Sequence, residues 1–235
     1  MVPRIGKISL AIFDLDGVIY DVTGPVKDAA RDVIEKYRLP GSVDETLGDL
    51  FPLIEKLQAV PIPRIILGSY DLLRIPALEG MTLIKRLRVL MDFYARYREY
   101  KDAAEVFPSI PKLIRDLAAA GVKLAVQTNQ KADYARDVLD KVELSRVFSL
   151  ILGYNEVSKP KPDPEGIRKI MERLGVTDPS RVVYVGDMAT DVRAGKAAGV
   201  KTVAVATGLV PPEKLRAEGP DVLLEGVEGL GKVLL

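Results

Sequence analysis

The chain has 235 residues, of which 29% are charged and 48% are hydrophobic, a balance typical of a globular protein rather than a disordered one. Its 34 basic and 33 acidic side chains leave a formal net charge of +1, so no global electrostatic field favours nucleic acid or an anionic membrane as a partner. Because it has no cysteine and no histidine, the sequence excludes disulfides, thiolate nucleophiles and the common zinc sites. Its chemistry must rely on carboxylates, hydroxyls and amines.

The first apolar run, Lys7 to Phe13, predicts a buried strand that ends at an acidic turn beginning with Asp14. Asp14 interrupts this run before it could serve as the core of a signal peptide. No stretch of the sequence approaches the length of a membrane span. We therefore expect a cytoplasmic protein.

The next part of the chain lacks convincing strands and shows helical patterns separated by prolines and glycines. The predicted helices cover residues 26–37, 43–58 and 79–100. The third has apolar residues near one face, at Ile84, Leu87, Met91, Tyr94 and Tyr97. We interpret residues 21–104 as a helical insertion in a core domain formed by residues 1–20 and 105–235.

Five further apolar runs follow and alternate with helical patterns for most of their length. The predicted strands cover residues 122–126, 148–152, 182–185, 202–205 and 222–224, and the predicted helices cover residues 110–119, 132–142, 165–174 and 189–198. Strands that alternate with helices imply a parallel sheet covered on both faces. The expected fold class is therefore α/β, with a doubly wound core and an inserted α-helical domain.

Polar side chains stand at the ends of the predicted strands, where an open parallel sheet binds its ligands. They are Asp14 and Asp16 after the first run, Thr128 and Asn129 after the second, Lys159 in the loop after the third, and Asp187 and Asp191 after the fourth. Because carboxylates that gather in one place repel one another, they are stable in ionised form only around a cation.

Ligand sets made only of oxygen favour Mg²⁺, which takes a few carboxylates and keeps room for a substrate phosphate. Thr128 can donate a hydrogen bond to a phosphoryl oxygen, and backbone N–H groups near Asn129 can add others. Lys159 offers a positive charge. The sequence thus predicts a site for a phosphoryl group beside a Mg²⁺ ion.

Four short motifs in this order resemble those of the haloacid-dehalogenase-like phosphatase superfamily. They are FDLDGV at 13–18, QTN at 127–129, KPKPDP at 159–164 and GDMATD at 186–191. The resemblance covers the core, roughly residues 7–20 and 105–230, and the insertion resembles the helical cap of that family by its position. Among the branches, the chain is most similar to the phosphoglycolate phosphatases.

The resemblance implies a role for each matching residue. Asp14 would be the nucleophile that forms an aspartyl-phosphate, and Asp16 would be the general acid and base. The implied Mg²⁺ ligands are Asp14, the backbone carbonyl of Asp16, Asp187, and Asp191 as a ligand or as support for one. The implied phosphate-binding groups are Thr128, the backbone of Asn129, and Lys159.

Lys161 competes with Lys159 for the phosphate-binding role. Both lysines flank a proline in an extended loop that could aim either one inward. The family pattern of Lys-Pro-any-Pro selects Lys159, which leaves Lys161 solvated.

The expected reaction is hydrolysis of a small phosphomonoester, with phosphoglycolate as the leading substrate. Sugar phosphates, nucleoside monophosphates and inorganic pyrophosphate are alternatives. A second enzyme hypothesis is a phosphomutase of the β-phosphoglucomutase kind, which returns the phosphoryl group to a sugar. Outside enzymes, a module that binds metal and phosphate, such as a receiver-type signalling domain, is an alternative that the acid/base at Asp16 and the inserted domain disfavour.

The expected partner is therefore a small phosphorylated metabolite, with no role for nucleic acid or a membrane, and the protein is expected to be a monomer or a homodimer. Specificity is expected to lie in the insertion, because the core contacts only the phosphoryl group. Within it, a basic stretch contains Lys85, Arg86, Arg88, Arg96 and Arg98, while Arg64 and Arg74 stand in segments bounded by prolines. A charge run on a helix is usually a solvated face.

Overall fold

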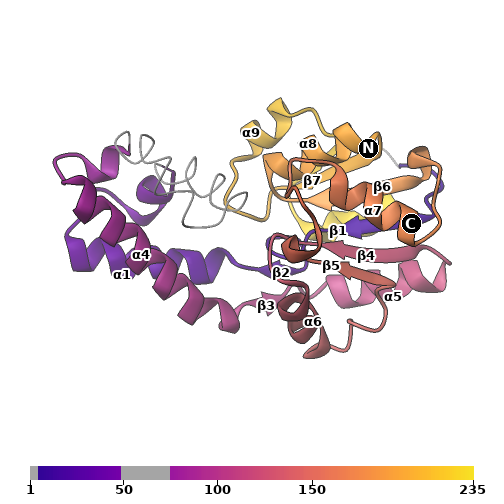
Figure 1. Cartoon of the computed structure of the whole chain (residues 1–235), viewed down its shortest axis with the longest axis horizontal. Coiled ribbons are helices and arrows are strands. Elements are labelled where there is room, and N and C mark those ends of the chain that lie inside the picture. The colour runs from indigo at the N-terminus through magenta and orange to yellow at the C-terminus, as the bar shows by residue number, and fades with distance from the viewer. Residues whose placement is uncertain (1–4, 49–74) are drawn as a thin grey trace. The chain divides into compact units, whose positions relative to one another are not determined.

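The computed structural model describes residues 5–48 and 75–235. The chain divides into two compact units (Figure 1): residues 1–21 with 106–235 form the first, and residues 22–105 form the second. These boundaries lie one residue from the expected ones at each junction. We refer to the first unit as the core domain and to the second as the inserted domain.

The core domain is built on a six-stranded parallel sheet with the order β5-β4-β1-β6-β7-β8. The strands are β1 (Leu10–Phe13), β4 (Lys123–Gln127), β5 (Leu150–Leu152), β6 (Val182–Gly186), β7 (Lys201–Val205) and β8 (Val222–Leu224). Phe13 pairs with Val126 on one side and with Val185 on the other, so the carboxyl ends of the three central strands meet. The expected α/β fold class is confirmed.

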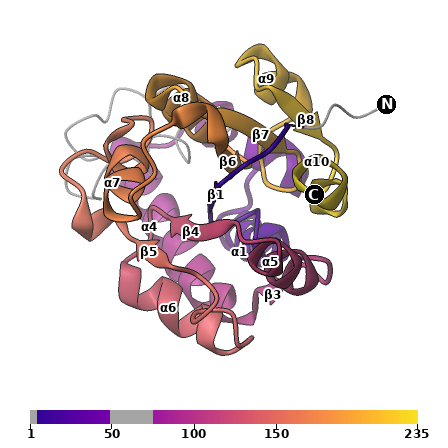
Figure 2. The ribbon, with the colours of Figure 1, turned by 90° about the vertical axis from the view of Figure 1, so that its right-hand side faces the viewer.

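Helices cover both faces of this sheet, with α7 and α8 on one face and α5 and α10 on the other (Figure 2). The helices are α5 (Ile110–Ala119), α6 (Ala132–Asp140), α7 (Glu165–Arg173), α8 (Ala189–Ala198), α9 (Pro212–Ala217) and α10 (Leu230–Leu234), and short 3₁₀ turns are η4 (Tyr154–Glu156), η5 (Pro179–Arg181) and η6 (Val227–Gly229). On α7, Ile167, Ile170 and Met171 recur at helical spacing and pack against Leu10 and Ile12 of β1. The long apolar runs of the strands are explained by this burial on both faces.

Two very short strands were not expected from the sequence. β2 (Tyr20–Asp21) and β3 (Glu105–Val106) form a separate two-stranded sheet. Two residues are too few for an alternating pattern to be recognised, and for that reason the sequence showed no strand between residue 13 and residue 122.

The inserted domain contains a packed pair of helices, α1 (Thr23–Tyr37) and α4 (Leu83–Tyr100), with the 3₁₀ turns η2 (Pro76–Leu78) and η3 (Lys101–Ala103). Residues 43–48 are helical, as expected, but the rest of the predicted helix 43–58 lies outside the described residues, as do Arg64 and Arg74. At this helix pair the phenol of Tyr100 donates to Asp32 Oδ2 at 2.7 Å, and the phenol of Tyr37 donates to Asp92 Oδ2 at 2.6 Å.

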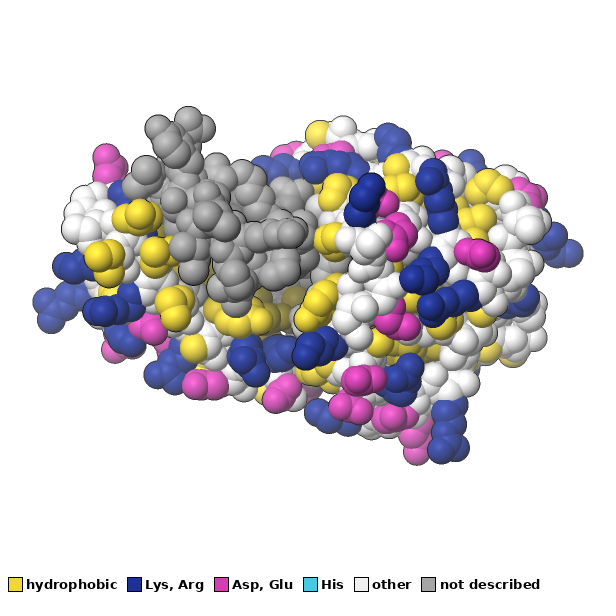
Figure 3. Space-filling view, in the orientation of Figure 1, with side chains coloured by type: hydrophobic (Ala, Val, Ile, Leu, Met, Phe, Trp, Pro, Cys, Tyr) yellow, Lys and Arg dark blue, Asp and Glu magenta, His cyan; other side chains and the backbone are white. Residues whose placement is uncertain are grey.

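The face of α4 that packs against α1 is not the apolar face that was predicted from the sequence. Val89 and Phe93 are buried, whereas Ile84 is 72% exposed and Met91 is 67% exposed. Figure 3 shows apolar side chains along α4, while acidic and basic side chains are interspersed over the core domain. The helix therefore carries two apolar stripes, and the sequence alone could not show which one meets α1.

None of the described helices is both long and apolar enough to be a membrane span. The longest of them, α4, has 18 residues, but charged side chains are spread along it.

Candidate active site

Three aspartates meet at the carboxyl ends of the central strands. One carboxylate oxygen of each lies within 4.8 Å of the others, and the residues are Asp14, Asp187 and Asp191. All three are at least nine-tenths buried, with exposed fractions of 5%, 4% and 1%. Of the four aspartates that follow the predicted strands, these three have carboxylates that lie together in the structure.

Asp14 stands directly after β1 and is held by the backbone around it. Its N–H donates to the carbonyl of Val185 at 2.9 Å, which extends the pairing of β1 with β6 by one residue. Its Oδ1 accepts a hydrogen bond from the N–H of Leu15 at 2.8 Å. These two bonds fix where the carboxylate points.

Asp191 lies in the first turn of α8, where its carboxylate caps the helix. Its Oδ2 accepts a hydrogen bond from the N–H of Met188 at 3.0 Å, so an acidic side chain satisfies an otherwise unpaired donor at the helix start. Gly186 is required here, because a Cβ at that position would lie 2.2 Å from Asp191 Cβ. The carboxylate of Asp191 therefore caps α8 and also belongs to the cluster of three aspartates.

The carboxylate of Asp187 is enclosed by two glycines from different loops. A Cβ on Gly17 would lie 2.2 Å from Asp187 Oδ2, and a Cβ on Gly208 would lie 1.8 Å from the same atom. The hydroxyl of Thr207 donates to the carbonyl of Gly17, which joins the two loops. Any side chain at either glycine would displace Asp187. The sequence pattern pointed to neither Thr207 nor Gly208.

Lys161, not Lys159, reaches the aspartates. Its Nζ lies 2.9 Å from Asp14 Oδ2 and 2.7 Å from Asp191 Oδ1, and its side chain is 1% exposed. The Lys159 side chain is 72% exposed and lies 3.8 Å from Asp163. The expectation that Lys161 is solvated is therefore wrong. The two lysines have the same local sequence context, and only the path of the loop distinguishes them.

Lys161 also lies over the ring of Tyr184, with Nζ 5.9 Å from the ring centroid. Burial lowers the pKa of a lysine, but the carboxylates of Asp14 and Asp191 outweigh it and raise the pKa of Lys161 well above its ordinary value. Lys161 is therefore a fixed positive charge in the site.

The carboxylates themselves resist ionisation without a further cation. Burial raises the pKa of Asp14 from 3.8 to about 7, against the lowering effect of Lys161. Burial, with the charges of Asp191 and Asp14, raises the pKa of Asp187 well above its ordinary value. In the described part of the chain, Asp187 Oδ1 is buried and has no hydrogen-bond partner. A buried, unpaired carboxylate oxygen beside two other aspartates fits a hard divalent cation.

Thr128 and its neighbours line the next strand end. Thr128 is 3% exposed, and its Oγ1 accepts a hydrogen bond from the N–H of Gln130 at 3.0 Å. The oxygen is thus an acceptor in the turn, and its own proton remains for another acceptor. Asn129 Nδ2 is a buried donor without a hydrogen-bond partner among the described residues.

Asp16 is half-buried, and its carboxylate does not belong to the cluster of three aspartates. Its Oδ2 accepts a hydrogen bond of 2.9 Å from Nε2 of Gln130. The sequence analysis did not single out Gln130, although it directly follows the Thr-Asn pair.

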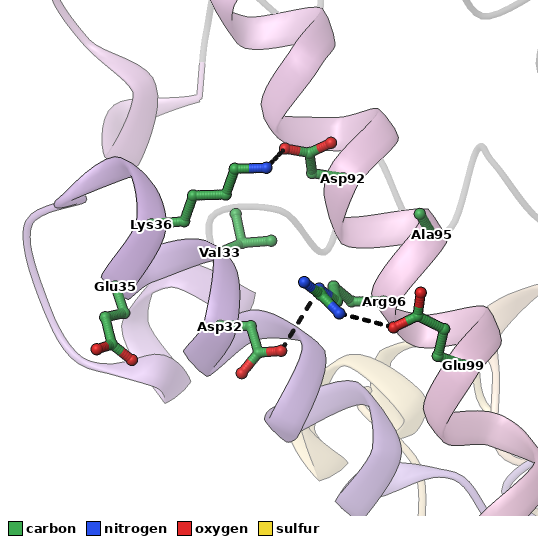
Figure 4. Close-up of a pocket in the computed structure, with 8 residues that line it drawn as sticks. All are labelled: Asp32, Val33, Glu35, Lys36, Asp92, Ala95, Arg96 and Glu99. Atoms are coloured by element: carbon green, nitrogen blue, oxygen red, sulfur yellow. Dashed lines mark hydrogen bonds and ion pairs between the residues drawn. The ribbon is translucent and has the colours of Figure 1, made fainter.

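The inserted domain has its own groove between α1 and α4 (Figure 4). It has a volume of about 460 Å³ and is lined by Asp32, Val33, Glu35, Lys36, Asp92, Ala95, Arg96 and Glu99. Lys36 pairs with Asp92 at 2.5 Å, and Arg96 lies 2.8 Å from Glu99 and 3.6 Å from Asp32. Because its cations are already paired with carboxylates, this groove is poorly suited to a phosphorylated ligand.

Comparison with known proteins agrees with the fold and with the motifs. The model of the haloacid dehalogenase-like hydrolase family matches residues 8–199. This chain therefore belongs to that family of hydrolases.

The curated relatives of this chain include proteins named phosphoglycolate phosphatase. The protein of Salmonella paratyphi A is 30% identical over 159 residues, which are 66% of this chain and 62% of that protein. The chain thus spans less than two thirds of this relative. The protein of Pseudomonas putida is 28% identical over 222 residues, covering 94% of this chain and 78% of that protein.

A solved structure from Lactobacillus delbrueckii subsp. bulgaricus, provisionally assigned as a phosphoglycolate phosphatase, has the same architecture. Its TM-score is 0.71 with 26% identity, and the match covers 97% of this chain and 99% of the other. The match therefore extends over the inserted domain as well as the core domain.

Proposed function

We propose that the protein is a Mg²⁺-dependent phosphatase that hydrolyses a small phosphomonoester through an aspartyl-phosphate on Asp14. The observation that carries this proposal is the buried cluster at the strand ends, in which the carboxylate of Asp14 lies beside Asp187, Asp191 and the ammonium of Lys161. The family match and the names of the curated relatives support it.

The first half of the reaction makes the phosphoenzyme. An oxygen of Asp14 attacks phosphorus, the bond to the leaving oxygen breaks, and Asp16 in its acid form gives a proton to that oxygen. In the second half, water attacks phosphorus and Asp16, now a carboxylate, takes a proton from it. The bond to Asp14 then breaks and inorganic phosphate leaves.

The charges around Asp14 are arranged for this transfer. Asp14, Asp187, Asp191 and the backbone carbonyl of Asp16 would hold Mg²⁺, which would supply positive charge to stabilise the transferring phosphoryl group. We assign the phosphate-binding ammonium to Lys161, because Lys159 is exposed. The hydroxyl of Thr128 and the backbone at Asn129 would donate hydrogen bonds to the remaining phosphoryl oxygens.

For the substrate we propose a small phosphorylated metabolite of the phosphoglycolate type. This assignment rests on the names of the relatives and on the insertion of a helical domain, which we propose is a cap that supplies specificity. The core alone can recognise only the phosphoryl group.

The test is phosphate release from a panel of phosphomonoesters, including phosphoglycolate, sugar phosphates and nucleoside monophosphates, together with pyrophosphate. Each compound is measured with Mg²⁺ and with a chelator. We expect Mg²⁺-dependent turnover that Asp14→Asn abolishes, with the fold and Mg²⁺ binding of that variant checked separately. Asp133→Asn on the exposed side of α6 is the matched control and should keep full activity.

Either of two results would contradict this proposal. One is turnover that persists in Asp14→Asn. The other is a native protein that binds Mg²⁺ but releases no phosphate from any compound. In the second case, a stable phosphoenzyme that needs a sugar bisphosphate for turnover would point to a phosphomutase.

A further inference from the structure

We propose that Gln130 is a positioning residue that holds Asp16 in place for its acid and base steps. The inference rests on the proposed function, because only that function gives Asp16 a proton to transfer. Nε2 of Gln130 donates a hydrogen bond to Asp16 Oδ2 at 2.9 Å. The two residues are 114 positions apart in the sequence, and both lie in the core domain.

The backbone of Gln130 is fixed on both sides. Its N–H donates to Thr128 Oγ1 at 3.0 Å, and its carbonyl accepts a hydrogen bond from the N–H of Tyr154 at 3.0 Å. The second bond joins the turn after β4 to the turn after β5. The backbone of Gln130 is therefore held in place at the point from which its side-chain amide reaches Asp16.

This close approach depends on Gly153. A Cβ at Gly153 would lie 2.7 Å from the carbonyl oxygen of Gln130 and 2.2 Å from the backbone nitrogen of Ala132. Because residue 153 is a glycine, the turn that carries Gln130 can approach this closely. Any side chain at position 153 would displace that turn.

An amide suits this role better than a charged side chain. Asp16 must be a carboxylic acid in one half of the reaction and a carboxylate in the other. A lysine or arginine would favour only the carboxylate, whereas a glutamine offers both a donor and an acceptor. Gln130 can therefore hold Asp16 in either state, and since it does not titrate it acts only through the position of Asp16.

The sharpest test uses the leaving group of the substrate. An alkyl phosphate needs the proton of Asp16 because an alkoxide is a poor leaving group. The 4-nitrophenolate of 4-nitrophenyl phosphate is a good leaving group and departs without a proton. Gln130→Leu keeps the approximate size of the side chain and removes both hydrogen-bonding groups. We expect kcat/KM, which covers the steps up to the departure of the leaving group and not the later hydrolysis of the phosphoenzyme, to fall about 10–100-fold for an alkyl phosphate and less than about threefold for 4-nitrophenyl phosphate.

A merely structural role for Gln130 would lower both activities by the same factor. Gln127→Leu is the control for that case, because Gln127 is 3% exposed on β4 and has no hydrogen bond to Asp16 among those described. Its two activities should change together.

A double variant tests the inference more strictly. If Gln130 acts through Asp16, Gln130→Leu should have no further effect on kcat/KM for the alkyl phosphate once Asp16→Ala is present. Equal losses for both esters, or additive losses in the double variant, would overturn the inference while leaving the proposed function intact. A native protein that turns over neither ester would instead contradict the proposed function.

Discussion

Nζ of Lys161 lies 2.7 Å from Oδ1 of Asp191, and both side chains are only 1% exposed. This ion pair joins the Pro-rich loop that follows β5 to the first turn of α8. A buried charge needs its partner, since the remaining member would otherwise be left without compensation. The ion pair therefore holds the side chains of both Lys161 and Asp191 in position.

Replacing Lys161 should be far more damaging than replacing Lys159. Lys161→Met removes the positive charge from between two buried carboxylates, so we expect a loss of about 3–5 kcal/mol in unfolding free energy. Phosphate release should fall at least about 100-fold, because the transferring phosphoryl group loses its charged donor. Denaturant unfolding and phosphate assays are the measurements.

Lys159→Met is the matched control for this comparison. The Lys159 side chain is 72% exposed, so its loss should change stability by no more than about 0.5 kcal/mol. The assignment to Lys161 would be wrong if Lys159→Met abolished turnover while Lys161→Met retained it.

Gly208 should be needed for full Mg²⁺ affinity although it carries no side chain. In Gly208→Ala the new Cβ would fall 1.8 Å from Asp187 Oδ2, so the carboxylate must move. We expect Mg²⁺ affinity to drop about 10–100-fold, as it does when the groups that orient a metal ligand are disturbed. Titration calorimetry with Mg²⁺ alone measures this without any substrate.

The control for that variant is Gly231→Ala in α10. A Cβ there would meet nothing within 4 Å, so Mg²⁺ affinity should stay at the native value. Unchanged affinity in Gly208→Ala would show that Asp187 either moves freely or does not bind the metal.

The parts of this site that the sequence predicted are those tied to strand ends. Asp14, Thr128 and Asp187 each follow an apolar run, and parallel strands in register bring such positions together. At these residues the apolar pattern of the sequence predicts the same position that the pairing of the strands produces.

The remaining parts depend on the path of loops, which local pattern does not determine. Lys159 and Lys161 differ by two positions in one extended segment, and tertiary packing alone turned Lys161 inward. Gly208 acts through a contact with Asp187, 21 positions away, and Gln130 acts through a contact with Asp16, 114 positions away, and no local motif records either contact. On α4 two apolar stripes compete, and the sequence marked the exposed one.

The contribution of Asp14 to the stability of the metal-free protein should fall as pH rises from about 4 to about 7. Burial, opposed by Lys161, raises the pKa of Asp14 from 3.8 in an unperturbed side chain to about 7 in the folded protein. A carboxyl with a raised folded pKa contributes stability that is fully present below about pH 4 and is lost as pH rises through about 7. The effect of Asp14 is at most about 4 kcal/mol.

Mg²⁺ should cancel this loss, because it binds the ionised carboxylates. Melting temperatures measured with a chelator and with Mg²⁺ should differ more at pH 8 than at pH 5. In Asp14→Asn the part of the pH dependence that comes from this group should disappear. A Mg²⁺ effect that is equal at both pH values would contradict the assignment of the metal to these aspartates.

The inserted domain offers a direct test of which face of α4 packs. Phe93 is 8% exposed and Met91 is 67% exposed, although they are only two positions apart. Phe93→Ala should lower the unfolding free energy by about 3 kcal/mol, because it leaves a cavity beside α1. Met91→Ala should change it by no more than about 0.5 kcal/mol.

Because the chain forms two compact units, the transition should be followed by hydrogen exchange at the amides of α1 and α4. Equal losses in the two variants would mean that the stripe containing Met91 is also covered in solution.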